Sequence, residues 1–422
     1  MLQNPFYLFF TACLGLFFWA GYRRIFAEVP YRHSLWSFLG EECAPGQRRA
    51  IVRALLAGLP GDSGAMAWIL TMAALCLGGA GALFWYLVFS LLWLHPLGAL
   101  AGLWCYYQPG CGGRVELSAL LEGILCRKRA RARPGLGRLL RWLQTLALCG
   151  MLPLLFRILA SPSAPARGAG LLPWLVVLLA LWLLCRLVGE RGETVLSLLF
   201  LLLLAAALLG NLPNLIPAVK LVLLDAFDRS RFLFSLSGAG LAAALQAGGA
   251  AGCGGALLRT LSAREEGPSF AHPAQAAFYE ELRGLLQLTV QLALGLLFLC
   301  ARLVPEDNRW PQTCLWAFLC LFGLLWLGRA VRALARPEGR RCGLLCLGLV
   351  GAAAVWDIWK GTALLPGLSG GAAGLASLAL AGLLLFDSNW YFLLLEHYRD
   401  VHIWHVTPHP DLMQTEMERK NM

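Results

Sequence analysis

The chain has 422 residues, of which 59% are hydrophobic and only 14% are charged, and its mean hydropathy is +0.65. A soluble domain needs far more charge to cover its surface, so this composition excludes a soluble globular protein and predicts a polytopic membrane protein. The formal net charge is +11. The basic residues lie in short segments between apolar runs, without the interleaved aromatic residues of a nucleic-acid surface, so no nucleic-acid partner is expected.

Hydropathy predicts about eleven helical spans of roughly 17–25 residues each. The expected spans are residues 6–22, 49–77 (interrupted), 80–106, 139–159, 170–188, 194–217, 233–257 (rich in glycine), 282–303, 312–334, 342–356 and 367–386. Residues 1–390 are therefore expected to form a single all-α transmembrane domain, followed by a cytoplasmic tail over residues 391–422.

Arginine and lysine gather in alternate connecting segments, which orients the spans. The basic segments fall within residues 23–53, 127–141 and 329–341. The positive-inside rule places these segments in the cytoplasm. The sequence therefore predicts a multi-pass protein of the cell (inner) membrane, with its N-terminus outside and its C-terminus in the cytoplasm.

The second span is interrupted by residues 58–67, whose sequence is GLPGDSGAMA. Proline lacks an N–H group and glycine has low helix propensity, so the helix should break here. Interrupted spans build the substrate and ion sites of secondary transporters, and an intramembrane carboxylate marks a functional site. Asp62 is therefore the strongest candidate for binding, while a loop that leaves Asp62 in water is the alternative. Ser63 either adds a hydroxyl ligand for a hard cation or bonds back to a backbone carbonyl.

The seventh span contains a run of glycines, at Gly248, Gly249, Gly252, Gly254 and Gly255. Two interpretations remain open. Small residues at close spacing permit tight contact between membrane helices. Alternatively, the span is unwound, exposes backbone groups of Gly252 and Gly254, and brings residues 251–256 within reach of Asp62. Two breaks five spans apart fit an inverted repeat of five plus five helices.

Polar residues elsewhere give weaker signals. Gln287 and Gln291 lie one turn apart on the eighth span and should point into the bundle, either toward a ligand or into hydrogen bonds between helices. His95, beside Pro96, is interpreted as structural. The two prolines of residues 211–218 predict that the sixth span ends there, with a helix exit and re-entry at the outer surface, and a solvated polar loop is expected over residues 225–231.

No catalytic or metal motif is recognisable. The C-terminal histidines are interpreted as part of a solvated tail because their spacing matches no metal site; they are His397, His402, His405 and His409. The fourteen cysteines are scattered as small hydrophobes. The chain has no P-loop, no HExxH and no nucleophile–base arrangement. The sequence thus predicts neither an enzyme nor a bound cofactor or metal.

Six short sequences occur in the chain in an order that resembles a known family. They are PGDSGAMA at residues 60–67, GGAGALFW at 78–85, IPA at 216–218, AGCGGA at 251–256, HP at 272–273 and VWDIWK at 355–360. Together they resemble the alanine or glycine:cation symporter family, the bacterial sodium:alanine symporters. The resemblance implies the leucine-transporter fold, with a five-plus-five inverted repeat and broken helices 2 and 7. It also implies symport of a small amino acid, such as alanine or glycine, with Na⁺ or H⁺ as the coupling ion.

The resemblance also indicates which residues would bind substrate and ion. The expected site consists of Gly61, Asp62, Ser63, Gly64, Gly252, Gly254 and Gln287. The family has an asparagine where this chain has Asp62. A carboxylate out of water is costly to ionise, so Asp62 is expected to bind a cation or to exchange a proton.

The chain departs from the family pattern at several polar positions. Residues 245–250 are mostly alanine and glycine where the family has charged and polar side chains. This loss leaves a second function open, that of a transport-inactive relative serving as a membrane scaffold or partner subunit. The sequence does not indicate an oligomeric state.

Overall fold

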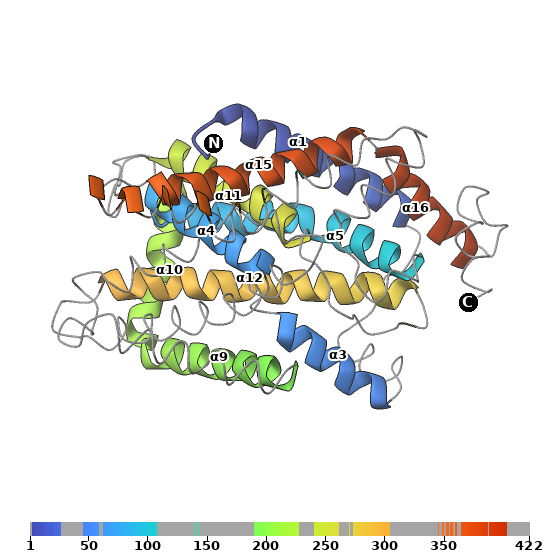
Figure 1. Cartoon of the computed structure of the whole chain (residues 1–422), viewed down its shortest axis with the longest axis horizontal. Helices are drawn as coiled ribbons and strands as arrows, with labels where there is room; N and C mark the ends of the chain where they lie inside the picture. Colours follow the sequence, from blue (N-terminus) through green and yellow to red (C-terminus); the bar gives the residue numbers. More distant parts are fainter. Residues whose placement is uncertain are drawn as a thin grey trace.

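The computed structural model describes residues 2–26, 45–58, 62–107, 190–227, 240–260, 273–303, 364–386 and 388–402, with isolated residues at 139, 143, 270 and between 345 and 360. The long described segments fold into helices (Figure 1). These are α1 (Pro5–Phe26), α3 (Pro45–Gly58), α4 (Asp62–Gly78), α5 (Ala82–Tyr107), α9 (Glu190–Gly210), α10 (Leu212–Phe227), α11 (Leu241–Thr260), α12 (Pro273–Leu303), α15 (Leu364–Phe386) and α16 (Ser388–His402).

Four of the described helices are long and apolar enough to cross a membrane. Their spanning segments are Pro5–Ile25, Ala82–Leu103, Leu241–Thr260 and Pro273–Cys300. Two bent helix pairs raise the number to six if each pair is one span. The chain is therefore an all-helical, polytopic membrane protein in the part that the structure describes.

The helices agree with several expected spans. The spans expected at residues 6–22, 80–106 and 367–386 correspond to α1, α5 and α15. α12 includes the span expected at residues 282–303 but begins at Pro273, nine residues earlier. The spans expected at residues 139–159, 170–188 and 312–334 lie almost wholly outside the described residues, so the total of about eleven stays a prediction.

The expected break in the glycine-rich seventh span is wrong. α11 is one continuous helix from Leu241 to Thr260. Its glycines face α5 so closely that a Cβ on Gly248 would lie 2.2 Å from the carbonyl oxygen of Ala82, and one on Gly252 would lie 2.6 Å from that of Tyr86. Such contact between backbones stabilises membrane helix pairs by close packing. The close-packing interpretation of the glycines is therefore the correct one.

α4 and α5 are joined by a tight turn that contains Gly79. This residue has a φ of 72° and its N–H donates to the carbonyl of Leu75, so it ends α4 in the left-handed conformation that favours glycine. A Cβ on Gly81 would lie within 2.6 Å of the Asp225 backbone, so the turn also needs a glycine where α10 packs against it. Trp85 then donates from Nε1 to the carbonyl of Ala226, near the end of α10.

The sixth span is interrupted where the prolines were expected to end it, because α9 stops at Gly210; the position of this end at the outer surface stays a prediction. The chain bends by 87° at Asn211 and continues as α10. Asn211 serves both helices, because its side-chain amide donates to the carbonyl of Ala207 and its own carbonyl accepts from the N–H groups of Asn214 and Leu215. Asp225 therefore lies in a helix, not in the expected polar loop.

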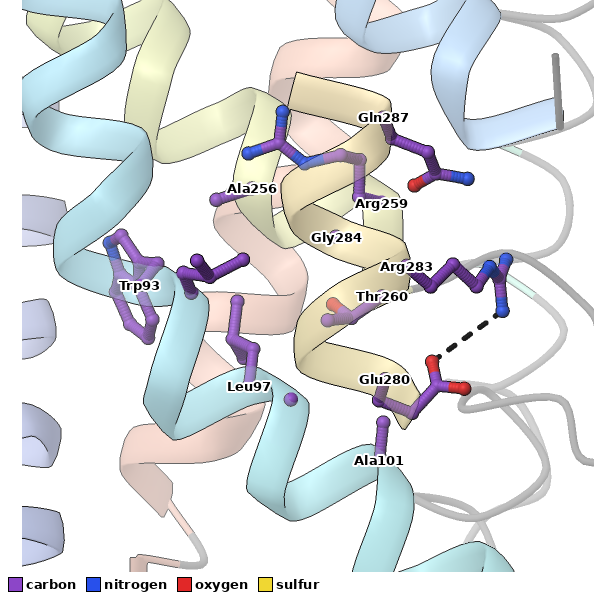
Figure 2. Close-up of a pocket in the computed structure, with 12 residues that line it drawn as sticks. Trp93, Leu97, Ala101, Ala256, Arg259, Thr260, Glu280, Arg283, Gly284 and Gln287 are labelled. Atoms are coloured by element: carbon purple, nitrogen blue, oxygen red, sulfur yellow. Dashed lines mark ion pairs between the residues drawn. The ribbon is translucent and has the colours of Figure 1, made fainter. Parts of the chain in front are cut away.

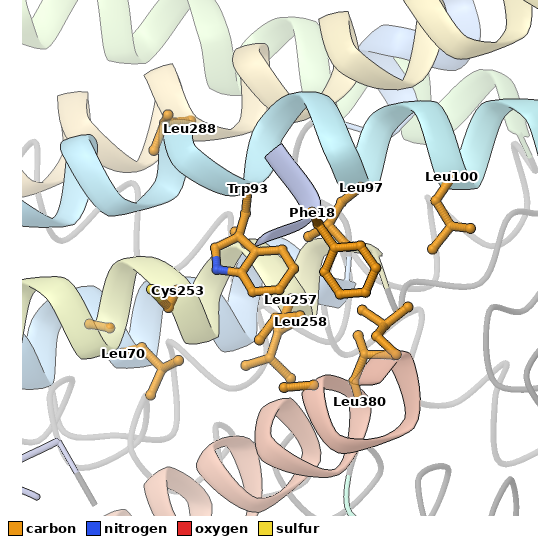
Figure 3. Close-up of a cluster of buried hydrophobic side chains, with 14 of the residues drawn as sticks. Phe18, Leu70, Trp93, Leu97, Leu100, Cys253, Leu257, Leu258, Leu288 and Leu380 are labelled. Atoms are coloured by element: carbon orange, nitrogen blue, oxygen red, sulfur yellow. The ribbon is translucent and has the colours of Figure 1, made fainter. Parts of the chain in front are cut away.

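The core forms where α11 is surrounded by α1, α4, α5 and α15. Figure 3 shows Phe18, Trp93, Leu257 and Leu380 meeting there, and all four side chains are almost fully buried. α16 adds to the same core through Tyr391 and its neighbours. His397 of α16 is also fully buried. The interpretation of His397 as a solvated residue is therefore wrong, because this part of the C-terminal segment is a packed helix.

The membrane orientation is a prediction that labelling can test. In a cysteine-free background, single cysteines at residues 159–168 and 304–310 should react with a reagent that does not cross the membrane. Cysteines at residues 127–135 and 335–341 should react only after the membrane is opened, because these segments are basic and are predicted to lie in the cytoplasm. The reverse pattern would overturn the predicted topology. All four segments lie outside the described residues.

Candidate functional site

The second span is indeed divided into two helices, α3 and α4, and they have different neighbours. α3 buries Ile51 and Leu55 against Tyr279 of α12, whereas α4 packs mainly against α11. Figure 1 shows α3 lying apart from α4, toward α9. Gly61 lies outside the described residues. Asp62, Ser63 and Gly64 form the first turn of α4.

Contacts with α11 fix the level at which α4 begins. Leu70 lies 3.1 Å from the position of a Cβ on Gly254, and a Cβ on Gly78 would lie 3.0 Å from Cα of Ala244, so the two helices are antiparallel. At 1.5 Å per residue, Asp62 lies about 12 Å beyond Leu70, and Arg259 lies about 7.5 Å beyond Gly254 in the same direction. The start of α4 is therefore near the level of Arg259, and the expected contact of Asp62 with residues 251–256 stays a prediction.

Gly252 and Gly254 lie within the continuous part of α11 and are fully packed. The carbonyl of Gly252 accepts a hydrogen bond from the Ser90 hydroxyl at 3.2 Å. A Cβ on Gly254 would lie 2.7 Å from the Tyr7 hydroxyl, which is itself hydrogen-bonded to Ser377 at 2.6 Å. Both glycines therefore contact side chains of neighbouring helices. A role for either glycine in binding a ligand stays a prediction.

A polar pocket lies between α5, α11 and α12, close to the end of α11 (Figure 2). Its cavity volume is about 30 Å³, and the wider space between its lining atoms, about 370 Å³, includes open solvent. Its polar lining consists of Arg259, Thr260, Glu280, Arg283 and Gln287, and Trp93 and Leu97 contribute an apolar wall. Among the sequence-predicted site residues, Gln287 is the one that lines this pocket.

Arg259 is the central polar group of the pocket. Only 6% of its surface is exposed. Its Nη1 donates to Gln291 Oε1 at 2.8 Å and to the Tyr86 hydroxyl at 3.2 Å, and Tyr86 donates to the same Gln291 oxygen at 2.5 Å. These hydrogen bonds hold the guanidinium at Nη1. A guanidinium has five N–H donors in a planar fork, which suits bidentate binding of a carboxylate.

The remaining polar residues lie on successive turns of α12. Glu280 and Arg283 form an ion pair at 3.5 Å, and the side chains of both are about 10% exposed. Gln287 follows one turn later and is 2% exposed. Figure 2 shows Gln287 at the end of the pocket near Arg259, with the ion pair toward the other end. The pocket therefore offers the Arg259 guanidinium and the Gln287 amide beside an Arg283–Glu280 ion pair, and Arg259 is the group that suits a small solute with an anionic group.

Sequence reasoning missed Arg259, although a signal for it exists. The residue follows the predicted end of the seventh span by two positions, where a basic side chain is usually taken as an anchor at the membrane surface. Its place inside the bundle depends on α11 continuing to Thr260 and on α12 beginning at Pro273. Gln291 was expected to point into the bundle and does so, at 2% exposure.

Metal ligands are not assembled in the part of the chain that the structure describes. No group of three His, Cys, Asp or Glu side chains there is placed to hold a metal ion.

The Thr260 hydroxyl at the pocket donates a hydrogen bond to the carbonyl of Leu257 at 2.6 Å, as a threonine in the last turn of a helix often does.

No family model matches the sequence, and no curated protein matches it. Solved structures of three variants of the manganese transporter of Eremococcus coleocola are similar to the chain, with TM-scores of 0.47, 0.44 and 0.42 and 14% sequence identity. Each alignment covers 92% of this chain and 93% of the transporter. With TM-scores below 0.5, the likeness is too slight to assign a fold family or a substrate.

Proposed function

We propose that the protein is a secondary active transporter, and that the pocket around Arg259 binds the carboxylate of a small amino acid such as alanine or glycine. The observation that carries the proposal is the buried guanidinium, held by Tyr86 and Gln291 beside an open pocket in the interior of a membrane bundle. Charged residues inside membrane bundles are costly and mark substrate or ion pathways. Arginine in particular matches the planar geometry of a carboxylate.

The interrupted second span supplies the second part of the proposed site. The first turn of α4 begins near the level of Arg259, so Asp62 and the adjacent Gly61, Ser63 and Gly64 are proposed to complete the binding site. An amino acid is a zwitterion, and a site with Arg259 for its carboxylate and Asp62 for its ammonium or for Na⁺ would complement both charges. Na⁺ or H⁺ is the proposed coupling ion. The inverted repeat of five plus five helices is part of the same proposal.

A thermal-shift experiment tests the proposal. The purified full-length chain is heated with and without alanine or glycine, in sodium chloride and in choline chloride. A ligand that binds the folded state raises the apparent unfolding temperature by mass action. We expect a rise of at least about 2 °C from one of the two amino acids at saturation, and a dependence of this rise on Na⁺ or on pH. Asp62→Asn should remove that ion dependence while leaving the ligand-free unfolding temperature unchanged.

The alternative function, a transport-inactive membrane scaffold or partner subunit, has its own support in the structure. The continuous α11 lacks the second break that alternating access around paired broken helices would use. The same experiment separates the two functions. If neither amino acid shifts the unfolding temperature under any of these ionic conditions, transport of alanine or glycine is excluded and the scaffold is favoured.

A further inference from the structure

A second polar cluster lies where α1, α5 and α12 meet, separate from the pocket. Its centre is Glu281, whose side chain is 9% exposed, and its outer member is His95, whose side chain is 50% exposed. His95 Nδ1 lies 3.0 Å from Glu281 Oε2, and the Tyr22 hydroxyl donates to Glu281 Oε1 at 3.4 Å. Both carboxyl oxygens of a buried glutamate are thus met by groups that can carry a proton.

Two glycines on α5 leave space for the Glu281 side chain of α12. A Cβ on Gly98 would lie 2.5 Å from Cγ of Glu281, and one on Gly102 would lie 2.2 Å from Cα of Ala277. The two glycines therefore let α12 approach α5 closely along one face. His95 lies three residues before Gly98, on the same face of the helix, so the imidazole is positioned directly beside the gap that Glu281 fills.

Several further titratable groups surround the pair. Tyr22 stacks on His95 with ring centroids 5.9 Å apart and an interplanar angle of 18°. From α16, Tyr391 is close enough to interact electrostatically with Tyr22 and Glu281, and Tyr398 with Tyr22. On α12 itself, the neighbouring Glu280 is engaged with Arg283. The described groups facing Glu281 are therefore one imidazole and neutral phenols.

We propose that His95 and Glu281 form a proton-binding site that takes up and releases one proton. In the deprotonated state the imidazole is neutral and the carboxylate carries one negative charge. A proton enters at the imidazole, the more exposed member of the pair, and is then shared between Nδ1 and Oε2, so the pair becomes neutral overall. Release reverses the step. A carboxylate and a histidine in contact inside a membrane bundle have the composition of a proton relay.

In a transporter, this site makes the proton a coupling ion, and this consequence rests on the proposed transport function. The binding of a proton by His95 and Glu281 does not depend on that function. The structural alternative is a permanent ion pair between charged His95 and charged Glu281, whose protonation would not change over the range in which histidine normally titrates.

Infrared difference spectroscopy of the full-length protein in lipid vesicles distinguishes these alternatives, with the proton itself as the only probe. Spectra are compared between about pH 5 and pH 8, the range over which histidine changes its charge. We expect the wild type to show the carbonyl band of a protonated carboxylic acid that changes over this range. Glu281→Gln should remove that band, and His95→Gln should move its midpoint by about one pH unit or more.

Asp400→Asn is the control, because Asp400 carries a carboxyl group on α16 that is engaged with Arg399 and lies outside the pocket; its band should equal that of the wild type. If Glu281→Gln does not fold, Glu281→Asp keeps a carboxyl group in the cluster and should move the frequency or the midpoint of the band. A band that persists unchanged in the Glu281 variants, or no band in the wild type, would overturn the proposal. Since no amino acid or Na⁺ is added, such a failure is separate from a failure of the thermal-shift test.

Discussion

Replacing Arg259 by lysine is expected to reduce strongly the rise in unfolding temperature that a given concentration of alanine or glycine produces in the wild type. Lysine keeps the positive charge but loses the planar fork that suits a carboxylate. It also loses the two bonds that orient the group toward Tyr86 and Gln291. Loss of one charge-assisted hydrogen bond to the ligand costs about 2 kcal/mol, so the affinity should fall about thirtyfold. A titration of the thermal shift against amino-acid concentration measures this change.

Arg53→Lys is the matched control for this experiment. Arg53 is exposed on α3, so the same chemical change should leave the affinity and the ligand-free unfolding temperature unaltered. The ligand-free unfolding temperature of Arg259→Lys shows whether the variant is folded. A folded Arg259→Lys protein that binds the amino acid as tightly as the wild type would mean that the guanidinium does not hold the carboxylate.

The long apolar helices of this fold could be predicted from the sequence because their signal is local. α1, α5 and α15 are continuous apolar runs of sufficient length, and a helix satisfies all their backbone groups within the segment itself. The α16 helix could also have been predicted. Its buried residues Tyr391, Leu394, Leu395 and Tyr398 follow the i, i+3, i+4, i+7 spacing of an amphipathic helix. The nearby histidines and charges concealed that pattern.

The glycine-rich segment shows where local patterns no longer decide the structure. Low helix propensity predicts a break at Gly252 and Gly254, whereas close packing predicts a continuous helix, and both follow from the same residues. The decision depends on Ala82 and Tyr86, whose carbonyl groups approach α11 from a helix more than 150 residues away in sequence. Propensity is overridden because the buried helix has packing partners on nearly every side.

The candidate site could be predicted only in part. Its residues come from different helices, and they meet only because of how far these helices are shifted along one another. Gln287 was recognisable as a polar residue in an apolar run. Arg259 was not, since its depth depends on where α11 ends and on which face meets Tyr86. The level of Asp62 relative to Arg259 likewise comes from the contact between Leu70 and Gly254, which no local pattern specifies.

Replacing Gly248 by alanine is expected to destabilise the protein by driving a methyl group into the backbone of α5. The new Cβ would lie 2.2 Å from the Ala82 carbonyl oxygen and 2.9 Å from its carbonyl carbon and Cα. All three atoms belong to the backbone, so no side-chain rotation relieves the overlap and α5 must move away from α11. Overpacking of this kind costs about 3 kcal/mol, which exceeds the gain in helix propensity of about 1 kcal/mol. The apparent unfolding temperature in detergent should therefore fall by several degrees.

Gly382→Ala on α15 is the control that isolates the overlap from helix propensity. Gly382 is exposed, and a Cβ there would meet nothing within 4 Å. The same substitution should therefore leave the unfolding temperature unchanged or raise it slightly, since alanine is the better helix former by about 1 kcal/mol. The two variants differ only in what the added methyl group meets. If Gly248→Ala is as stable as Gly382→Ala, α5 and α11 do not approach each other at this point, and the close-packed arrangement around α11 is wrong.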